Sequence, residues 1–168
     1  DTGKKYVGPI NGSLDFRLDP LSAIEGGAQY LRDLTELFGS KILAVAAYNC
    51  GEGLVMDIVK RLGKKYAKEG KSPGEAYDIK NIFWHLPKET RGYVVSWLAN
   101  LTALDRVDYK LLPKHFEVYN RITTTKGDTL REIAKVRGIP LRELATANLH
   151  VKNINKSLDG GIEINVPK

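Results

Sequence analysis

The feature that most constrains the fold is a helical hydrophobic pattern that fills residues 20–105 and then stops. After Asp19-Pro20, a pair that favours the first turn of a helix, apolar residues recur at three- and four-residue spacing as far as Gly39. Residues 40–49 are apolar almost all round, which predicts a buried helix. Further helices are expected over residues 54–62 and 88–105, with an irregular segment over 1–20 and a loop carrying a short helix over 63–82.

The pattern changes after Asp108. Residues 109–120 contain Pro113 and alternate poorly, so we interpret them as a linker. Residues 121–168 then have the pattern strand, helix, helix, strand, with Ile162, Ile164 and Val166 alternating as in a half-buried strand. The expected fold class is α+β, with domains at 1–108 and 121–168.

Charge and composition leave few specific signals. The net charge is +6, and residues 121–168 hold nine Lys/Arg against five Asp/Glu. This balance suits an anionic partner, but the charges are interpreted as a scattered, solvated surface. A nucleic-acid-binding protein would need a clustered basic stripe or stacking aromatics, and the sequence suggests neither. It remains the remote alternative.

Several sites and segments are not expected. The single cysteine, Cys50, excludes an internal disulfide. His85 and His115 have no ligand partners at sensible spacing, so no metal and no cofactor are expected. No apolar run approaches the roughly 20 residues of a membrane-spanning helix. The sequence starts at Asp1 without a leader, so a signal peptide is expected to be absent from it.

The C-terminal part carries the most specific motif. Gly127 permits a tight turn from strand to helix, Asp128 or Thr129 can cap that helix, and Asn148 can hydrogen-bond its own turn. Leu130 begins the set of apolar residues that fill a small core.

Taken together, residues 121–168 resemble a LysM domain of βααβ form, a module that binds N-acetylglucosamine-containing glycans. The opening aromatic of the first strand is missing, and Asp159-Gly160-Gly161 replaces the usual Pro-Gly-Gln turn. The resemblance places a groove between the 127–130 loop and the loop after Asn148, and His150 is expected near this groove or on the surface. The saccharide-binding residues that it implies are Gly127, Asp128, Thr129, Leu130 and Asn148.

The helical part contains three motifs. They are Asp15-Phe16-Arg17-Leu18-Asp19-Pro20, Ala46-Ala47-Tyr48-Asn49-Cys50-Gly51-Glu52-Gly53 and Phe83-Trp84-His85-Leu86-Pro87-Lys88-Glu89-Thr90-Arg91-Gly92-Tyr93-Val94. A tyrosine ring beside an amide suits a pyranose with an N-acetyl group. In this order the motifs resemble the lytic transglycosylases of the goose-lysozyme-like superfamily, nearest to the type called membrane-bound lytic murein transglycosylase D. The resemblance implies a lysozyme-like partial domain, cleavage of the MurNAc–GlcNAc bond to 1,6-anhydro ends, and sugar contacts by Tyr48, Asn49 and Tyr93.

The resemblance also implies that the catalytic carboxyl lies elsewhere. In that family a glutamate followed by serine precedes a Gly-Leu-Met-Gln run that ends in Thr-Gly, and only Thr2-Gly3 matches this part. We therefore expect that the family's catalytic glutamate would precede residue 1. Glu52 and Glu89 are the weak candidates to replace it, and Glu25 is weaker still.

Three functional hypotheses follow. The first is part of a peptidoglycan lytic transglycosylase of the periplasm or cell envelope, inactive alone. Its partners would be peptidoglycan glycan strands and either the missing N-terminal half or a second copy. The alternative is a non-catalytic peptidoglycan-binding module, and the remote alternative binds nucleic acid.

Overall fold

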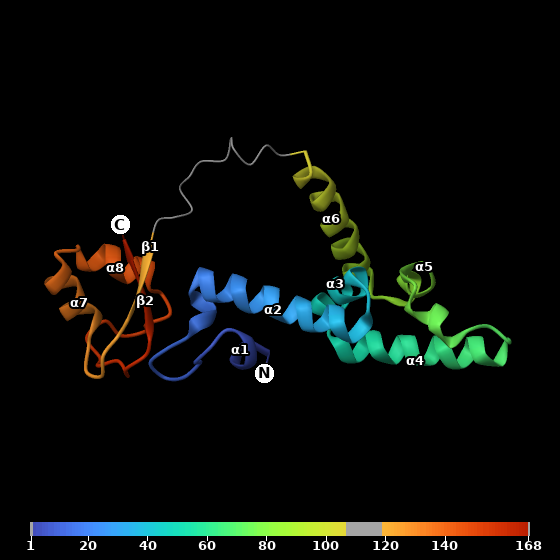
Figure 1. Cartoon of the computed structure of the whole chain (residues 1–168), viewed down its shortest axis with the longest axis horizontal. Helices are drawn as coiled ribbons and strands as arrows, with labels where there is room; N and C mark the ends of the chain where they lie inside the picture. The colour runs from blue at the N-terminus through green and yellow to red at the C-terminus, as the bar shows by residue number, and fades with distance from the viewer. Residues whose placement is uncertain (1, 107–118, 168) are drawn as a thin grey trace. The chain divides into compact units, whose positions relative to one another are not determined.

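The computed structural model describes residues 2–106 and 119–167. The described residues are mostly helical, with one two-stranded antiparallel sheet, which confirms the expected α+β class. The helices of the first part are α1 (Thr2–Tyr6), α2 (Pro20–Phe38), α3 (Lys41–Cys50), α4 (Glu52–Lys68), α5 (Ile79–Ile82) and α6 (Lys88–Leu104), with 3-10 turns at Phe16–Leu18, Pro73–Tyr77 and Phe83–His85 (Figure 1). The last part consists of β1 (Tyr119–Thr123), α7 (Leu130–Arg137), α8 (Leu141–Ala147) and β2 (Glu163–Pro167).

The compact units are divided differently from the predicted domains. Residues 1–27 group with residues 111–168 in one unit, and residues 28–110 form the other. Helix α2 therefore begins in the first unit and continues into the second. The predicted domain boundaries stay a prediction, because a unit defined by contacts need not be a unit of evolution.

The 28–110 unit is built around α3. Ser40 caps this helix by accepting a hydrogen bond from the backbone N–H of Leu43, and five consecutive residues, 43–47, are buried. The prediction of a buried helix over 40–49 is thus confirmed for residues 43–47, while Lys41 and Tyr48 are exposed. Helices α4 and α6 both contact α3, and they contribute Val55, Ile58, Val59, Leu62 and Val94 to one apolar core.

Helix α4 continues to Lys68, so the predicted end at residue 62 and the predicted loop over 63–82 are wrong in their first part. Tertiary packing explains the extension. The 3-10 turn Pro73–Tyr77 packs along α4 and buries Gly63. A Cβ atom on Gly63 would lie 3.5 Å from the carbonyl oxygen of Pro73. Local sequence cannot reveal this contact.

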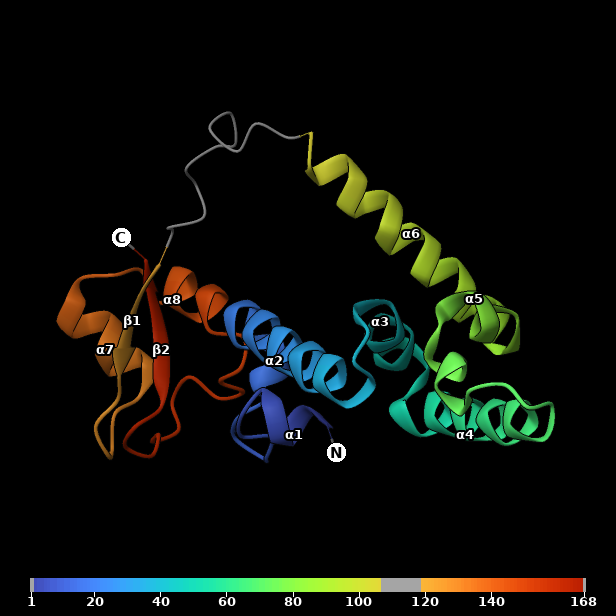
Figure 2. The ribbon, with the colours of Figure 1, turned by 45° about the vertical axis from the view of Figure 1, so that its right-hand side comes forward.

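In the other unit, β1 pairs antiparallel with β2, Ile122 lies opposite Ile164, and α7 and α8 pack beside the strands (Figure 2). The predicted strand, helix, helix, strand order is confirmed, with bounds shifted by one or two residues. Strand β1 begins at Tyr119, two residues before the predicted start of the C-terminal domain. Residues 109–118 of the predicted linker, with His115, lie outside the described residues.

The N-terminal segment completes the core of this unit. Leu14 and Phe16 are buried in the same cluster as Leu130, Leu144 and Ile164. Leu14 also forms a bridge with Val151, and the backbone N–H of Asp15 donates to the carbonyl of His150 at 2.7 Å. The expectation of an irregular segment over 1–20 holds except for α1 and the 3-10 turn, but its attachment to the C-terminal residues was not expected.

Candidate saccharide-binding site

Tyr48, Asn49 and Glu52, all from the second sequence motif, lie at the junction of α3 and α4. Gly51 ends α3 and begins α4 with φ at +89°, a conformation that glycine adopts readily and other residues avoid. Because the turn is so tight, Tyr48 and Asn49 in the last turn of α3 lie near Glu52 in the first turn of α4.

Tyr48 presents an aromatic surface to solvent. Its side chain is 40% exposed, and its ring centroid lies 5.5 Å from that of Tyr30 on α2. The Tyr30 hydroxyl in turn donates a hydrogen bond to Oε2 of Glu52 at 2.5 Å. The two rings and the carboxylate therefore form one connected cluster, with an exposed aromatic face and a hydrogen-bonding edge of the type that sugar rings contact.

Asn49 is held in place by α6. Its Oδ1 accepts a hydrogen bond from the hydroxyl of Thr90 at 2.8 Å, and Thr90 is buried. Tyr93, which is 41% exposed, follows Thr90 by about one turn of α6. This bond brings the end of α3 to the helix that carries Tyr93. Tyr30 and Thr90 were not predicted as supporting residues, although Thr90 stands in the third motif.

Cys50 lies behind this site. Burial raises the pKa of its thiol, although a hydrogen bond with Thr90 acts in the opposite direction. A thiol with a raised pKa is a poor nucleophile at neutral pH. Cys50 is therefore better suited to packing than to covalent catalysis.

The candidate carboxyl groups are all exposed. Glu52 and Glu89 both face solvent in the first turns of their helices. Glu25 is exposed too, and it lies 3.4 Å from Arg121. A general acid that protonates a glycosidic oxygen needs an apolar, largely buried setting to keep its proton near neutral pH, and none of these three positions has one.

In the C-terminal part, two loops lie side by side. The backbone N–H of Gly127 donates to Leu158 at 3.1 Å, and the N–H of Leu158 donates to the carbonyl of Asp128 at 2.8 Å. The side chain of Asp128 accepts from the N–H of Thr125, and Thr129 caps α7 by accepting from the N–H of Glu132. The two loops are the ones that the sequence predicted to border a groove.

Two of the predicted contact residues are buried instead. Leu130 has no exposed surface and belongs to the core. Asn148 is equally buried, and its side chain pairs with the backbone of Leu144 and Asn165 through three hydrogen bonds of 2.7–2.8 Å. Neither side chain can reach a ligand, so direct contact with a glycan remains a proposal for Gly127, Asp128 and Thr129.

His150 does not lie on the surface, and that expectation is wrong. Its ring is fully buried, 4.6 Å from the ring of Phe16, with Nε2 3.1 Å from the carbonyl oxygen of Glu163. The other ring nitrogen, Nδ1, is buried and has no hydrogen-bond partner among residues 2–106 and 119–167. Burial lowers the pKa of His150, and the nearby carboxylate of Asp19 offsets part of this effect.

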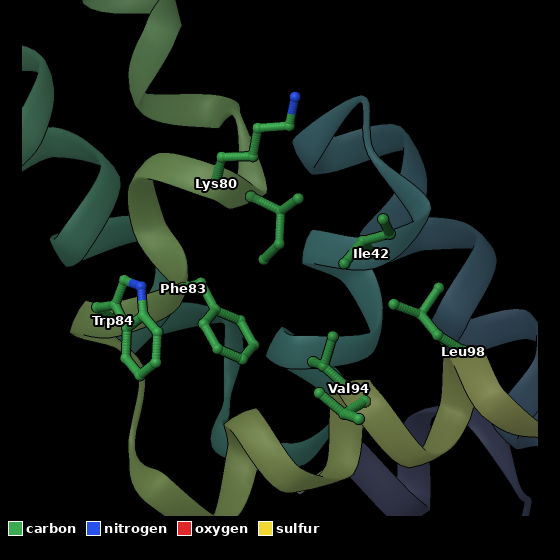
Figure 3. A pocket seen from close by; sticks show the side chains of 8 residues that line it. Ile42, Lys80, Phe83, Trp84, Val94 and Leu98 are labelled. Carbon is green, nitrogen blue, oxygen red and sulfur yellow. The ribbon is translucent and has the colours of Figure 1, made fainter.

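A further hollow lies between α3, α5 and α6 (Figure 3). It encloses about 380 Å³, and the ring of Phe83 points into it while the ammonium group of Lys80 points away. The lining is almost entirely apolar, so it offers few partners for sugar hydroxyls. Within residues 2–106 and 119–167, no three His, Cys, Asp or Glu side chains are grouped to hold a metal ion. No described helix is both long and apolar enough to cross a membrane.

Comparison with known proteins gives a consistent result. Residues 1–71 match the transglycosylase SLT domain family. The chain is 29% identical over 174 residues to membrane-bound lytic murein transglycosylase D of Escherichia coli K12, an alignment that covers 99% of this chain and 36% of that protein. It is also 29% identical over 161 residues to membrane-bound lytic murein transglycosylase F of Pseudomonas fluorescens Pf-5, covering 84% of this chain and 27% of that protein.

The chain thus spans about a third of the length of these relatives. The matched domain includes Tyr48, Asn49 and Glu52, and it ends before α6 and the C-terminal module. The chain is thus similar to lytic transglycosylases, and its residues 1–71 are similar to the SLT domain of that group.

Proposed function

We propose that this chain is part of a peptidoglycan lytic transglycosylase of the bacterial periplasm or cell envelope. The complete enzyme would cleave the MurNAc–GlcNAc bond and leave 1,6-anhydro-MurNAc ends. The observation that carries the proposal is the α3–α4 junction, where Tyr48 offers an exposed ring and Asn49 an oriented amide within the matched SLT domain.

In this proposal the junction is a sugar-contacting surface. The ring of Tyr48 would stack on the apolar face of a pyranose, and the amide of Asn49 would recognise its N-acetyl group. The bond from Thr90 fixes Oδ1 of Asn49 and leaves the amide N–H groups as donors. Tyr93 would extend the surface along α6.

The C-terminal module would bind N-acetylglucosamine-containing glycan as a LysM domain does. The exposed backbone of Gly127 and the partly exposed Asp128 and Thr129 support this part of the proposal, since they border the two apposed loops. The module would raise the local concentration of substrate at the junction, as linked binding sites do in general.

We further propose that the catalytic acid of the complete enzyme is a glutamate other than Glu52 and Glu89. Both carboxylates are exposed, and Glu52 already accepts a hydrogen bond from the hydroxyl of Tyr30. The chain alone would then bind peptidoglycan without cleaving it.

The test is incubation of the purified chain with peptidoglycan sacculi, followed by sedimentation and mass spectrometry of the supernatant. We expect the chain to pellet with the wall and to release no 1,6-anhydro-muropeptides. Tyr48→Ala is expected to weaken binding roughly fivefold, in line with about 1 kcal/mol for one stacked aromatic. Tyr77→Ala removes a tyrosine of equal exposure from a different surface and is the control.

Each other outcome contradicts one part of the proposal. Anhydro products would show that a carboxyl of this chain is catalytic, and Glu52→Gln and Glu89→Gln would then identify it. If Tyr48→Ala and Tyr77→Ala weaken binding to sacculi equally, the α3–α4 junction is not the sugar site. If the chain does not sediment with sacculi, the proposal that it binds peptidoglycan is wrong.

A further inference from the structure

The exposed side of α4 carries a basic stripe, formed by Lys60, Arg61, Lys64, Lys65 and Lys68. The five side chains, together with Asp57, surround an open hollow of about 530 Å³. At 100° per residue they fall on the side of the helix opposite its buried residues. The sequence interpretation of a scattered charge is therefore wrong for this helix.

The stripe is only weakly neutralised by the protein. Among the described residues its ion pair is Lys65 with Glu69 at 3.9 Å, and Glu69 pairs more closely with Lys71 at 3.1 Å. Asp57 is the one carboxylate in the lining of the hollow. Three like-charge pairs stand at i, i+4 spacing (60 with 64, 64 with 68, and 61 with 65), and each opposes helix formation. Lys65 and Lys68 lie in the last turn of α4, where the helix dipole favours cations. The repulsion within the stripe opposes this gain, so a role in binding accounts better for the excess of positive charge.

The chemistry of the stripe favours a particular partner. Four of the five cations are lysines, whose hydrated ammonium groups on flexible stems attract anions without fixing their geometry. The lining contains no aromatic ring on which a base or a sugar could stack and no amide for an N-acetyl group. The apolar side of α4 is buried in the protein core, so this helix cannot insert among acyl chains.

We propose that the basic stripe of α4 docks the protein on the surface of an anionic phospholipid bilayer. The charges from Lys60 to Lys68 span about 12 Å along the helix axis, enough to lie over several lipid phosphates. Attraction would be electrostatic, additive over the five cations and screened by salt, because no built pocket selects one headgroup. This role is separate from glycan binding at the α3–α4 junction and does not depend on it.

The test is sedimentation of the full chain with sucrose-loaded vesicles of phosphatidylcholine alone or with 30 mol% phosphatidylglycerol, at low and high salt. We expect binding to the anionic vesicles at low salt and none to the neutral ones. The variant Lys60→Ala/Lys64→Ala/Lys68→Ala should lower the partition coefficient roughly a hundredfold, at about fivefold per cation. The control Lys126→Ala/Lys135→Ala/Arg137→Ala removes the same net charge from exposed positions of the C-terminal unit and should change it much less.

Thermal melts establish that both variants fold, since all six side chains are exposed. Equal losses in the two variants would overturn the proposal, because net charge alone would then explain binding. Binding of the wild-type chain to single-stranded DNA or to sacculi that depends on the stripe, without binding to anionic vesicles, would overturn it too. Retention of sacculus binding by the stripe variant would separate this surface from the sugar site.

Discussion

The side chain of Asn165 donates a hydrogen bond of 2.6 Å to Oδ1 of Asp19, joining two buried residues that are 146 positions apart in the sequence. The other carboxylate oxygen of Asp19 accepts the backbone N–H and the hydroxyl of Ser22 at the start of α2. Arg121 on β1 adds a charge 3.6 Å away. The first turn of α2 and the final strand are thus linked through a single buried carboxylate.

Replacing Asn165 is therefore expected to be costly. Asn165→Ala removes the donor to Oδ1 of Asp19 and to the carbonyl oxygen of Ala147. Because both acceptors are buried, we expect a loss of about 2–4 kcal/mol in the free energy of unfolding. Urea denaturation measures it. Asn120→Ala, at an exposed position of β1, should change the same quantity by less than about 0.5 kcal/mol. Similar effects of the two substitutions would contradict the network.

The free energy of unfolding should decrease as the pH is lowered, because of His150 and Asp19. Burial lowers the pKa of His150, so the unfolded chain takes up this proton first as the pH drops below about 6.5. Burial raises the pKa of Asp19, but hydrogen bonds from Ser22 and Asn165 outweigh it and lower the pKa overall. Its contribution is complete above about pH 4 and is lost as the pH falls through the lowered value.

The substitution His150→Gln tests the first of these effects. Glutamine retains a donor for the carbonyl of Glu163 but does not titrate, so the slope of unfolding free energy against pH should flatten below about pH 6.5. Urea midpoints at a series of pH values measure it, with His85→Gln as the exposed control. An unchanged slope in His150→Gln would show that the histidine is not responsible.

Two glycines should respond in opposite directions to alanine. A Cβ on Gly26 would lie 2.7 Å from the backbone oxygen of Tyr6, so α1 and α2 must move apart, and we expect a loss of about 1–3 kcal/mol. A Cβ on Gly92 of α6 meets nothing within 4 Å, so Gly92→Ala should add about 0.5–1 kcal/mol. Thermal melts of the two variants give the comparison, and a stable Gly26→Ala protein would contradict the close approach of the two helices.

The hydroxyl of Thr90 should support both Asn49 and Cys50. Thr90→Val keeps the shape but leaves Oδ1 of Asn49 without this donor, which predicts a loss of about 1–3 kcal/mol. It also removes the hydrogen bond that lowers the pKa of Cys50, so alkylation of the thiol at a fixed pH should slow down. Thr90→Ser retains the hydroxyl and should restore both properties; if it behaves like valine, the methyl group and not the hydroxyl is responsible.

The elements that local pattern decides were predictable from the sequence. Helices α2, α3 and α6 carry apolar residues at helical spacing and recognisable ends, such as the Ser40 cap, so their bounds are close to the expected ones. The last strand was also predictable from Ile164 and Val166, although Asn165 between them is buried as well, so the strand is not half-buried. The motif at the α3–α4 junction was recognisable because its residues are contiguous.

The features that depend on distant contacts were not predictable. The last turns of α4 are stabilised by the segment that packs on them, and the core position of Leu14 and Phe16 depends on residues more than a hundred positions away. Asn148 and His150 are polar residues that a pattern assigns to the surface, yet each is buried by partners on other segments. The basic stripe exists only because α4 continues past residue 62, an extension that depends on tertiary contacts.

Because Leu14 and Phe16 share a core with Leu130, Leu144 and Ile164, residues 14–16 must meet residues 130–164 before that core exists. A ribosome releases the N-terminal segment first and adds some 5–20 residues each second, so the segment waits on the order of ten seconds for its partners. The 28–110 unit can complete its own core during this interval. In the cell the 28–110 unit would then fold before residues 14–16 join residues 130–164 in their shared core.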